Sequence, residues 1–175
     1  MKTEQFIDLP WWVVRPLELL AAFAMVYMLT AFIDQKERER FDAIAPEEWF
    51  EVIELYVPDH EAGEDPLLAY DRDIRADFRG YWAVEIKNRD ALVNGGRFFT
   101  ACSGNGASDY DPGDVLDPAK VTWTWFIGRP CEVPPGIYRM EVTWDMKVPE
   151  SDKAKRYTAL SNAFRVYEPG ATPTR

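Results

Sequence analysis

The feature that most constrains this chain is the apolar block WWVVRPLELLAAFAMVYMLTAFI, which occupies residues 11–33. From residue 17 to residue 33, only Glu18 and Thr30 are not plainly apolar. As a helix, the block would extend ~35 Å at ~1.5 Å per residue, which is enough to cross a hydrocarbon layer about 30 Å thick. Pro16 is expected in the first helical turn, where its missing N–H costs nothing. The sequence therefore predicts a single N-terminal helix of transmembrane type.

The anchor side chains are expected to be the aromatic and large aliphatic residues of this helix. The tryptophan pair at its start would lie where aromatic residues gather at a headgroup boundary. The predicted residues of the membrane or assembly anchor are Trp11, Trp12, Leu17, Leu20, Phe23, Tyr27 and Phe32.

Three interpretations of the block compete, and a single membrane span is favoured. A cleaved secretory signal is disfavoured, because acidic residues accompany Lys2 at the start and no small-x-small cleavage site closes the block. The remaining alternative is a helix buried among protein subunits, since Glu18 is costly in lipid. That alternative requires an oligomer or a large complex. Basic residues flank the block almost equally, so the membrane orientation stays open.

The run DQKERERFDAIAPE at residues 34–47 predicts a charged stalk after the N-terminal segment of residues 1–33. Its alternating charges allow the helix to continue for a turn or two. Pro46 indicates that the helix has ended by Ala45, because the residue before a proline avoids the helical conformation.

The head, residues 48–168, follows a hydrophobic period of two, which is typical of strands. The expected strands are 50–57, 81–88, 97–102, 121–126, 136–148 and 161–168. The NGG sequence at residues 94–96 predicts a turn. Residues 58–80 predict a long loop with a short helix near residues 66–70. The Pro-rich tail at residues 169–175 is expected to be disordered.

The fold class expected for the head is an immunoglobulin-like antiparallel β-sandwich. The head is expected to contain about six or seven short strands, each with one apolar face. Two sheets packed face to face bury all of these apolar faces together. A small closed barrel is the alternative. The clearest strand is 136–148, and Val121, Trp123 and Trp125 are expected to share the apolar face of strand 121–126. The side chains expected to point inward from strand 136–148 are Tyr138, Met140, Val142, Trp144 and Met146.

The two cysteines of the chain, Cys102 and Cys131, allow one intramolecular disulfide. Such a bridge would close a loop of roughly 30 residues and stabilise the head by about 3–4 kcal/mol in the chain-entropy model. Its formation would place the head in an oxidising space, such as a periplasm or the cell exterior. The alternative is a pair of reduced thiols that behave as small core residues.

Chemical motifs are scarce in the sequence, which favours a non-enzymatic function. A net charge of −10 disfavours nucleic-acid binding, because an acidic surface repels phosphates. The single histidine, His60, lies in an acidic loop and is expected to be solvated. The sequence has no CxxC, HExxH or phosphate-binding glycine loop. No cofactor is expected apart from calcium.

Calcium is considered because GNGASDYDPGD places three carboxylates in a glycine-rich segment. Asp109, Asp111 and Asp114 are hard oxygen ligands at the short spacing that calcium sites use. The segment does not match the helix–loop–helix calcium consensus, and Asp-Pro-Gly is also ordinary turn chemistry. The metal site and the simple turn therefore both stay open.

The elements CSGNG…DYDPGD, VTWTWF, CEVPPGIYRMEVTWDM and LSNAFRVY, spread over residues 80–168, carry a resemblance. Their pattern resembles small uncharacterised proteins of bacteriophages and proteobacteria. Those proteins pair a short hydrophobic anchor with a β-rich head that bears Cys-x-x-Pro-Pro-Gly-x-Tyr and a closing Ser-Asn-x-Phe. The resemblance implies a phage or envelope setting and assigns no activity or site residue.

Two hypotheses for the function follow, and a hydrolase is a third that the scarcity of chemical motifs disfavours. The first is a non-enzymatic membrane-anchored module in a bacterial envelope, whose head engages a protein partner or forms a homo-oligomer. The second is a structural virion protein of a bacteriophage, whose N-terminal helix packs in an oligomeric assembly or enters a membrane.

Overall fold

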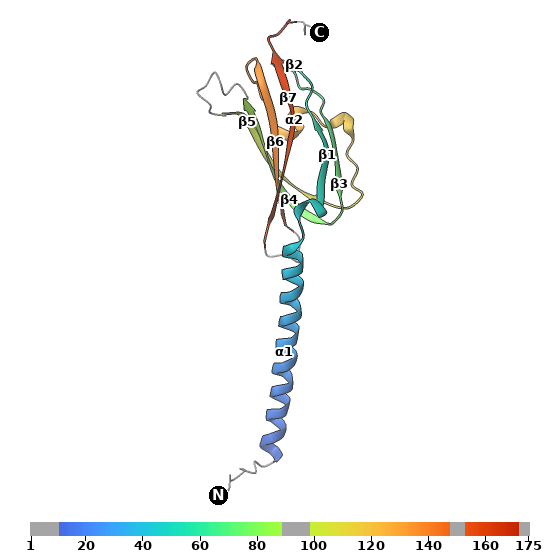
Figure 1. Ribbon diagram of the computed structural model, residues 1–175, viewed down its shortest axis with the longest axis vertical. Coiled ribbons are helices and arrows are strands. Elements are labelled where there is room, and N and C mark those ends of the chain that lie inside the picture. Colours follow the sequence, from blue (N-terminus) through green and yellow to red (C-terminus); the bar gives the residue numbers. More distant parts are fainter. Residues whose placement is uncertain (1–10, 89–98, 148–152, 172–175) are drawn as a thin grey trace. The chain divides into compact units, whose positions relative to one another are not determined.

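The computed structural model describes residues 11–88, 99–147 and 153–171, and the chain divides into two compact units between Ala43 and Ile44. The first unit is a long helix, and the second is mainly β (Figure 1). The predicted N-terminal apolar helix and β-rich head are therefore confirmed as the coarse architecture.

Helix α1 (Trp11–Ala43) runs without interruption from the apolar block through the charged run. The predicted extension past residue 33 is confirmed, and the helix ends before Pro46, as expected. The expected place of Pro16 is wrong, because this residue lies inside the helix rather than in its first turn. The residues before Pro16 continue the helix although the proline removes one of its hydrogen bonds.

The second unit contains seven described strands, one α-helix and two short 3-10 helices. Their bounds, in chain order, are η1 (Pro46–Glu48), β1 (Phe50–Tyr56), β2 (His60–Glu61), β3 (Ala69–Ile74), β4 (Phe78–Asn88), β5 (Thr100–Tyr110), η2 (Pro118–Lys120), α2 (Trp123–Ile127), β6 (Gly136–Lys147) and β7 (Lys155–Tyr167).

The strands form a five-stranded sheet of order β2-β7-β6-β4-β5 and a two-stranded sheet of β1 and β3. All strand pairs are antiparallel except β2 with β7, which is parallel. One face of the large sheet is apolar, as the alternation in β4 and β6 predicted. The five residues expected to point inward from β6 are all buried, with at most 1% of their surface exposed.

The apolar face of the large sheet is covered by the β1–β3 ribbon and by α2. Phe50 of β1 is fully buried, and its ring lies 5.0 Å from Trp144 and 5.6 Å from Phe78. From α2, the Trp123 ring lies 5.6 Å from Phe164 of β7. Because two strands and a helix form the covering layer, the predicted immunoglobulin-like pair of sheets is not confirmed.

Side chains join β1 to β7 without a backbone ladder. The Asn162 amide binds both backbone groups of Val57, accepting from N at 2.8 Å and donating to O at 2.9 Å. Nearer the start of β1, the Tyr157 hydroxyl accepts from Val52 N at 3.1 Å. These side-chain contacts hold β1 beside β7 although the two strands belong to different sheets. The two sheets together curl into an open half-barrel (Figure 1).

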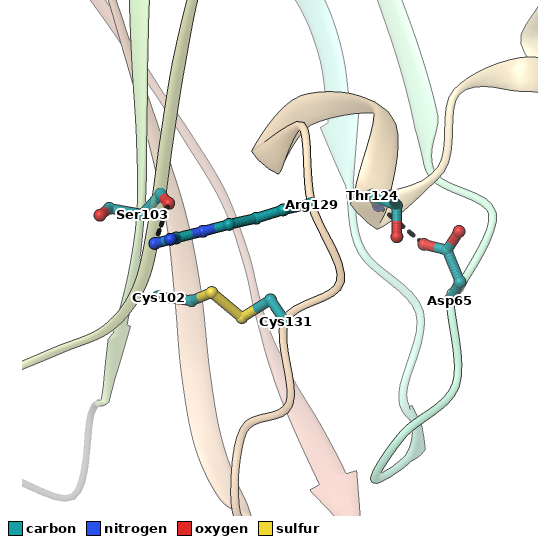
Figure 2. The surroundings of a disulfide bond; sticks show 6 residues. All are labelled: Asp65, Cys102, Ser103, Thr124, Arg129 and Cys131. Carbon is teal, nitrogen blue, oxygen red and sulfur yellow. Dashed lines mark hydrogen bonds between the residues drawn. A yellow bond between two sulfur atoms is a disulfide. The ribbon is translucent and has the colours of Figure 1, made fainter.

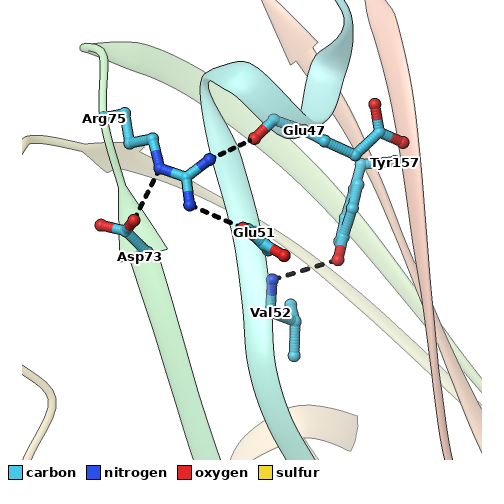
Figure 3. Close-up of polar contacts among 6 residues, drawn as sticks. All are labelled: Glu47, Glu51, Val52, Asp73, Arg75 and Tyr157. Carbon is cyan, nitrogen blue, oxygen red and sulfur yellow. Dashed lines mark hydrogen bonds and ion pairs between the residues drawn. The ribbon is translucent and has the colours of Figure 1, made fainter.

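The entry into the head is organised by one arginine (Figure 3). Arg75 binds the carboxylates of Glu51 and Asp73 at 2.6 Å each and the Glu47 carbonyl at 3.0 Å. Its backbone N–H also donates to Trp49 O at 2.8 Å. The arginine therefore ties η1, β1 and the end of β3 together.

The expected strand 121–126 is wrong, because residues 123–127 form helix α2. The Thr122 hydroxyl accepts from Trp125 N at 3.3 Å and caps the first turn. The Asp65 carboxylate accepts from Thr124 N at 2.7 Å. Gly128, with φ of 73°, ends the helix in the left-handed conformation that glycine favours. The buried side chains of α2 therefore follow a helical spacing, whereas Trp125 remains 41% exposed. The buried ones are Trp123, Phe126 and Ile127.

The expected loop over residues 58–80 is also wrong in part, since it contains β2 and β3, and β4 begins at Phe78 rather than at residue 81. No helix forms over residues 66–70. The strand β3 is held by six register pairs with β1 and by the buried side chains of Tyr70 and Ile74. Its alternating charges, Asp71, Arg72 and Asp73, concealed this pattern. The expected NGG turn lies outside the described residues.

Candidate functional site

The apolar part of α1 is exposed around its whole circumference. Exposed fractions at the predicted anchor positions are 65% for Leu20, 71% for Phe23, 75% for Tyr27 and 56% for Phe32. The other large side chains exposed there are Leu19, Met25, Val26, Met28, Leu29 and Ile33. Trp11, Trp12 and Leu17 lie in α1, but their side chains are not among the described ones.

Helix α1 is long and apolar enough to cross a membrane, judged by length and composition. The part of the helix that is long and apolar enough is residues 18–43. None of its most apolar stretch of 18 residues is buried by the rest of the chain. An N-terminal signal sequence satisfies the same test. A helix with no polar face requires a partner or a lipid environment that covers it.

The polar groups of the helix are arranged as this interpretation requires. The Thr30 hydroxyl donates back to the carbonyls of Val26 and Tyr27, at 3.1 and 2.9 Å, so it presents no unsatisfied donor. After the apolar block, Lys36 binds Glu39 at 2.6 Å.

The disulfide predicted from the cysteine count is present between Cys102 of β5 and Cys131 (Figure 2). The two Cα atoms lie 6.3 Å apart, within the range that disulfides span. Beside the bridge, Arg129 Nη2 donates to Ser103 O at 3.4 Å. Disulfides persist in oxidising compartments, so the bridge points to an oxidising space around the head.

The three carboxylates of the calcium hypothesis lie at the end of β5 and in the turn that follows. Asp109 is paired with Arg79 at 3.1 Å. The Asp114 carboxylate accepts from Asp111 N at 3.3 Å, and Asp114 N donates to Asp111 O at 3.0 Å. Within residues 11–88, 99–147 and 153–171, no three acidic, histidine or cysteine side chains form a group able to hold a metal ion. The geometry is that of a turn beside an ion pair.

His60 is buried, so its expected solvation is wrong. Only 7% of its surface is exposed, and its ring lies 5.2 Å from Trp123 and 5.7 Å from Phe164. Its Nδ1 lies 2.9 Å from Pro58 O. Aromatic neighbours and a backbone carbonyl make His60 a core residue.

Two buried tyrosines have perturbed acidity. Burial is the main cause that raises the pKa of the Tyr70 phenol well above its ordinary value, and burial likewise raises the pKa of Tyr110. The Tyr110 hydroxyl accepts from Trp144 Nε1 at 3.1 Å, and the Arg72 guanidinium lies 4.8 Å from the Tyr110 ring centre. Both phenols remain neutral at physiological pH and act as core hydrogen-bonding groups.

Two structural residues were not predicted from the sequence. Ser161 and Asn162 lie at a register shift between β6 and β7, where Ser161 Oγ accepts from Met140 N at 2.9 Å. The extra residue lets the Asn162 amide bind the backbone of Val57, directly after β1. A Ser-Asn pair inside an otherwise alternating strand was the available signal, because such residues often supply side-chain partners to backbone groups.

Comparison of the chain with protein-family models, with curated proteins and with solved structures finds no match in any of the three. The resemblance to phage and proteobacterial proteins therefore rests on the sequence elements alone.

Proposed function

We propose that this protein is a non-enzymatic, membrane-anchored module. Helix α1 lies in the bilayer, and the β head stands in an oxidising compartment, such as a periplasm or the cell exterior, where it engages protein partners. The observation that supports this proposal is the continuous apolar surface around α1, which the chain does not bury.

The energetic balance favours lipid for this helix. Covering one large apolar side chain is worth about 1.5–3 kcal/mol, and ten such side chains of α1 are between 47% and 75% exposed. A carboxylate at the bilayer centre costs about 2.5–3.5 kcal/mol, and less near the interface. Glu18 lies within the apolar block, and even the full cost of this one carboxylate is much smaller than the gain from the ten apolar side chains.

The disulfide supports the proposal that the head lies on the oxidising side of the membrane. Cysteines in a reducing cytosol remain thiols, whereas the Cys102–Cys131 bridge needs an oxidising environment to persist. A head outside the cytosol with an N-terminal helix as its tether satisfies both observations at once.

The test is alkaline carbonate extraction of membranes from cells that produce the full chain. We expect the protein to remain in the membrane pellet. The double variant Phe23→Arg/Leu29→Arg should move it to the supernatant, because two charges would enter the hydrocarbon layer. The matched control is Leu160→Arg on the head, where the leucine is already 51% exposed, and this variant should stay in the pellet.

The intact mass of the extracted protein separates an anchor from a cleaved signal. Retention of residues 1–43 in the membrane-bound protein supports the anchor. A mature chain that has lost the helix and is soluble would overturn the proposal, as would wild-type protein in the carbonate supernatant. Co-sedimentation with virus particles in fixed copy number would instead support a virion component.

A further inference from the structure

Strand β5 is an edge of the five-stranded sheet, and the hydrogen bonds show which of its backbone groups face outward. Met140 N donates to Ser161, so the backbone of Met140 faces β7. Because backbone direction alternates along a strand, Glu141 faces β4, and its partner Glu85 faces β6. Val84 then faces β5, and Asn88, whose N–H donates to Phe99 O, agrees with this assignment.

The same alternation determines the open side of β5. Gly104 pairs with Val84 and faces β4, so the odd-numbered residues from 103 to 109 direct N–H and C=O away from the sheet. The contact from Arg129 to Ser103 O confirms this direction. Among the described residues, the backbone groups of Asn105 and Ala107 have no intramolecular partner, and both residues are exposed.

The middle of this edge lacks the devices that usually prevent strands from pairing. Native edges are short, charged, interrupted by proline or bulged. At the opposite end of the sheet, β2 has only two residues, and β3 of the small sheet carries three consecutive charged residues, Asp71, Arg72 and Asp73. Between Ser103 and Ser108, β5 has neither charge nor proline, and its register with β4 is regular.

The two glycines of this edge are required by packing. A Cβ at Gly106 would lie 2.5 Å from the Trp82 ring, and one at Gly104 would lie 2.3 Å from the Ile127 carbonyl oxygen. The strand is therefore held in place on its inner face, and the disulfide at Cys102 fixes its first half. An ordered, uncharged row of backbone groups is a template for a further strand.

We propose that β5 pairs with β5 of a second copy of this chain, antiparallel and centred on Gly106. In this register Asn105 lies opposite the partner's Ala107, and Ser103 lies opposite the partner's Asp109, so no two like charges face each other. Arg129, which contacts Ser103 O, comes beside the second copy's Asp109. The two-fold symmetry repeats this complementary pair, which distinguishes a second copy from an arbitrary extended peptide.

The inference goes beyond the proposed membrane anchoring and does not depend on it. Anchoring would strengthen the pairing, because two tethered heads have a high effective concentration. The test therefore uses a contact that only this register creates, in the full chain solubilised in mild detergent.

The register predicts a crosslink that needs two different variants. Asn105→Cys and Ala107→Cys chains are purified separately, mixed, and oxidised with the native disulfide intact. Opposite residues of a hydrogen-bonded antiparallel pair have Cα atoms about 5.5 Å apart, which suits a disulfide. We expect a crosslinked dimer in the mixture and at least about tenfold less in either variant alone, because identical positions lie further apart.

A second substitution tests the backbone contact itself. Ala107→Pro, introduced into the Asn105→Cys chain, removes an outward N–H that the folded head does not use. With Asn105→Cys/Ala107→Pro mixed with Ala107→Cys, the crosslink should fall, whereas Ala107→Val in place of proline should retain it. Near-UV circular dichroism verifies that the head remains folded.

Equal crosslinking in mixed and unmixed samples would overturn the proposed register. Absence of the crosslink in the mixture, with folded heads, would overturn the pairing. Either result leaves the carbonate extraction unaffected, so failure of this inference is distinguishable from failure of the membrane anchor.

Discussion

Helix α1 and strand β6 are both rich in apolar residues, but they distribute them differently. In β6, apolar side chains alternate with polar ones, and the apolar set is buried beneath β1 and α2. In α1, apolar side chains surround the helix, and the rest of the chain buries none of its most apolar stretch. Periodicity, more than apolar content, therefore determines whether a segment is buried by its own chain or needs another environment.

The largest expected effect concerns a single ring at the centre of the head. Phe50→Ala removes a fully buried side chain that contacts four other aromatic rings. We expect the free energy of unfolding of the head to fall by about 3–5 kcal/mol. Denaturant unfolding in detergent, followed by tryptophan fluorescence, measures this loss.

Phe23→Ala is the matched control, since it removes the same ring from α1. Its side chain is 71% exposed, so the unfolding free energy of the head should change by less than about 0.5 kcal/mol. Equal losses for the two variants would contradict the distinction between the two regions.

The next effect concerns the covalent bridge, which stabilises the head and has no counterpart in α1. Replacement of Cys102 and Cys131 by serine should lower the unfolding free energy of the head by about 3–4 kcal/mol, because the unfolded chain gains conformational entropy. Thermal unfolding of the double variant beside the oxidised wild type measures the effect. Identical midpoints would show that the bridge contributes nothing to the fold.

A smaller effect is expected at the junction of β1 with β7. Asn162→Ala leaves both backbone groups of Val57 without their partner, and we expect a loss of about 1–3 kcal/mol in the unfolding free energy. Asn105→Ala is the control of the same residue type, because its exposed amide should contribute less than about 0.5 kcal/mol. A neutral Asn162→Ala variant would mean that the half-barrel does not depend on this amide.

The smallest effect at neutral pH concerns Tyr70. Burial raises its pKa in the folded head, so the unfolded chain releases the phenolic proton first, near pH 10. The stabilisation is fully present below about pH 10 and is lost as the pH rises toward the folded-state pKa. Tyr70→Phe should therefore show a shallower loss of stability between pH 10 and pH 11 in denaturant titrations. An unchanged slope would contradict the burial of this phenol.

The sequence-based predictions were accurate where neighbouring residues along the chain carry the pattern, and they failed where distant residues determine the structure. Strands β4 and β6 were predicted because every second residue is apolar, which is a local property. The expected strand 121–126 was wrong because Thr122 and Gly128 cap a helical turn, and aromatic residues that favour strands concealed these caps. The strand β3 was missed because Arg72, at an inward position of its alternation, lies over the Tyr110 ring.

In the candidate site, too, features with a local sequence pattern were predicted and features that depend on distant residues were not. The anchor positions Leu20, Phe23, Tyr27 and Phe32 were predicted from composition, and the structure leaves all four exposed. The open edge of β5 was not predicted, because GNGAS has the composition of a loop. Its glycines are explained only by Trp82 and by Ile127, which are distant in sequence and occupy the space where side chains would lie.

The long apolar helix, the alternating strands and the single possible disulfide follow from the amino-acid sequence alone. Each depends on helical length, on a period of two or on a count of cysteines, none of which requires knowledge of distant neighbours. In contrast, three features became evident from the folded head: a glycine-rich segment is an edge strand, His60 is a core residue, and α2 is helical. Those outcomes depend on which surfaces meet across the chain, and local sequence patterns do not encode that.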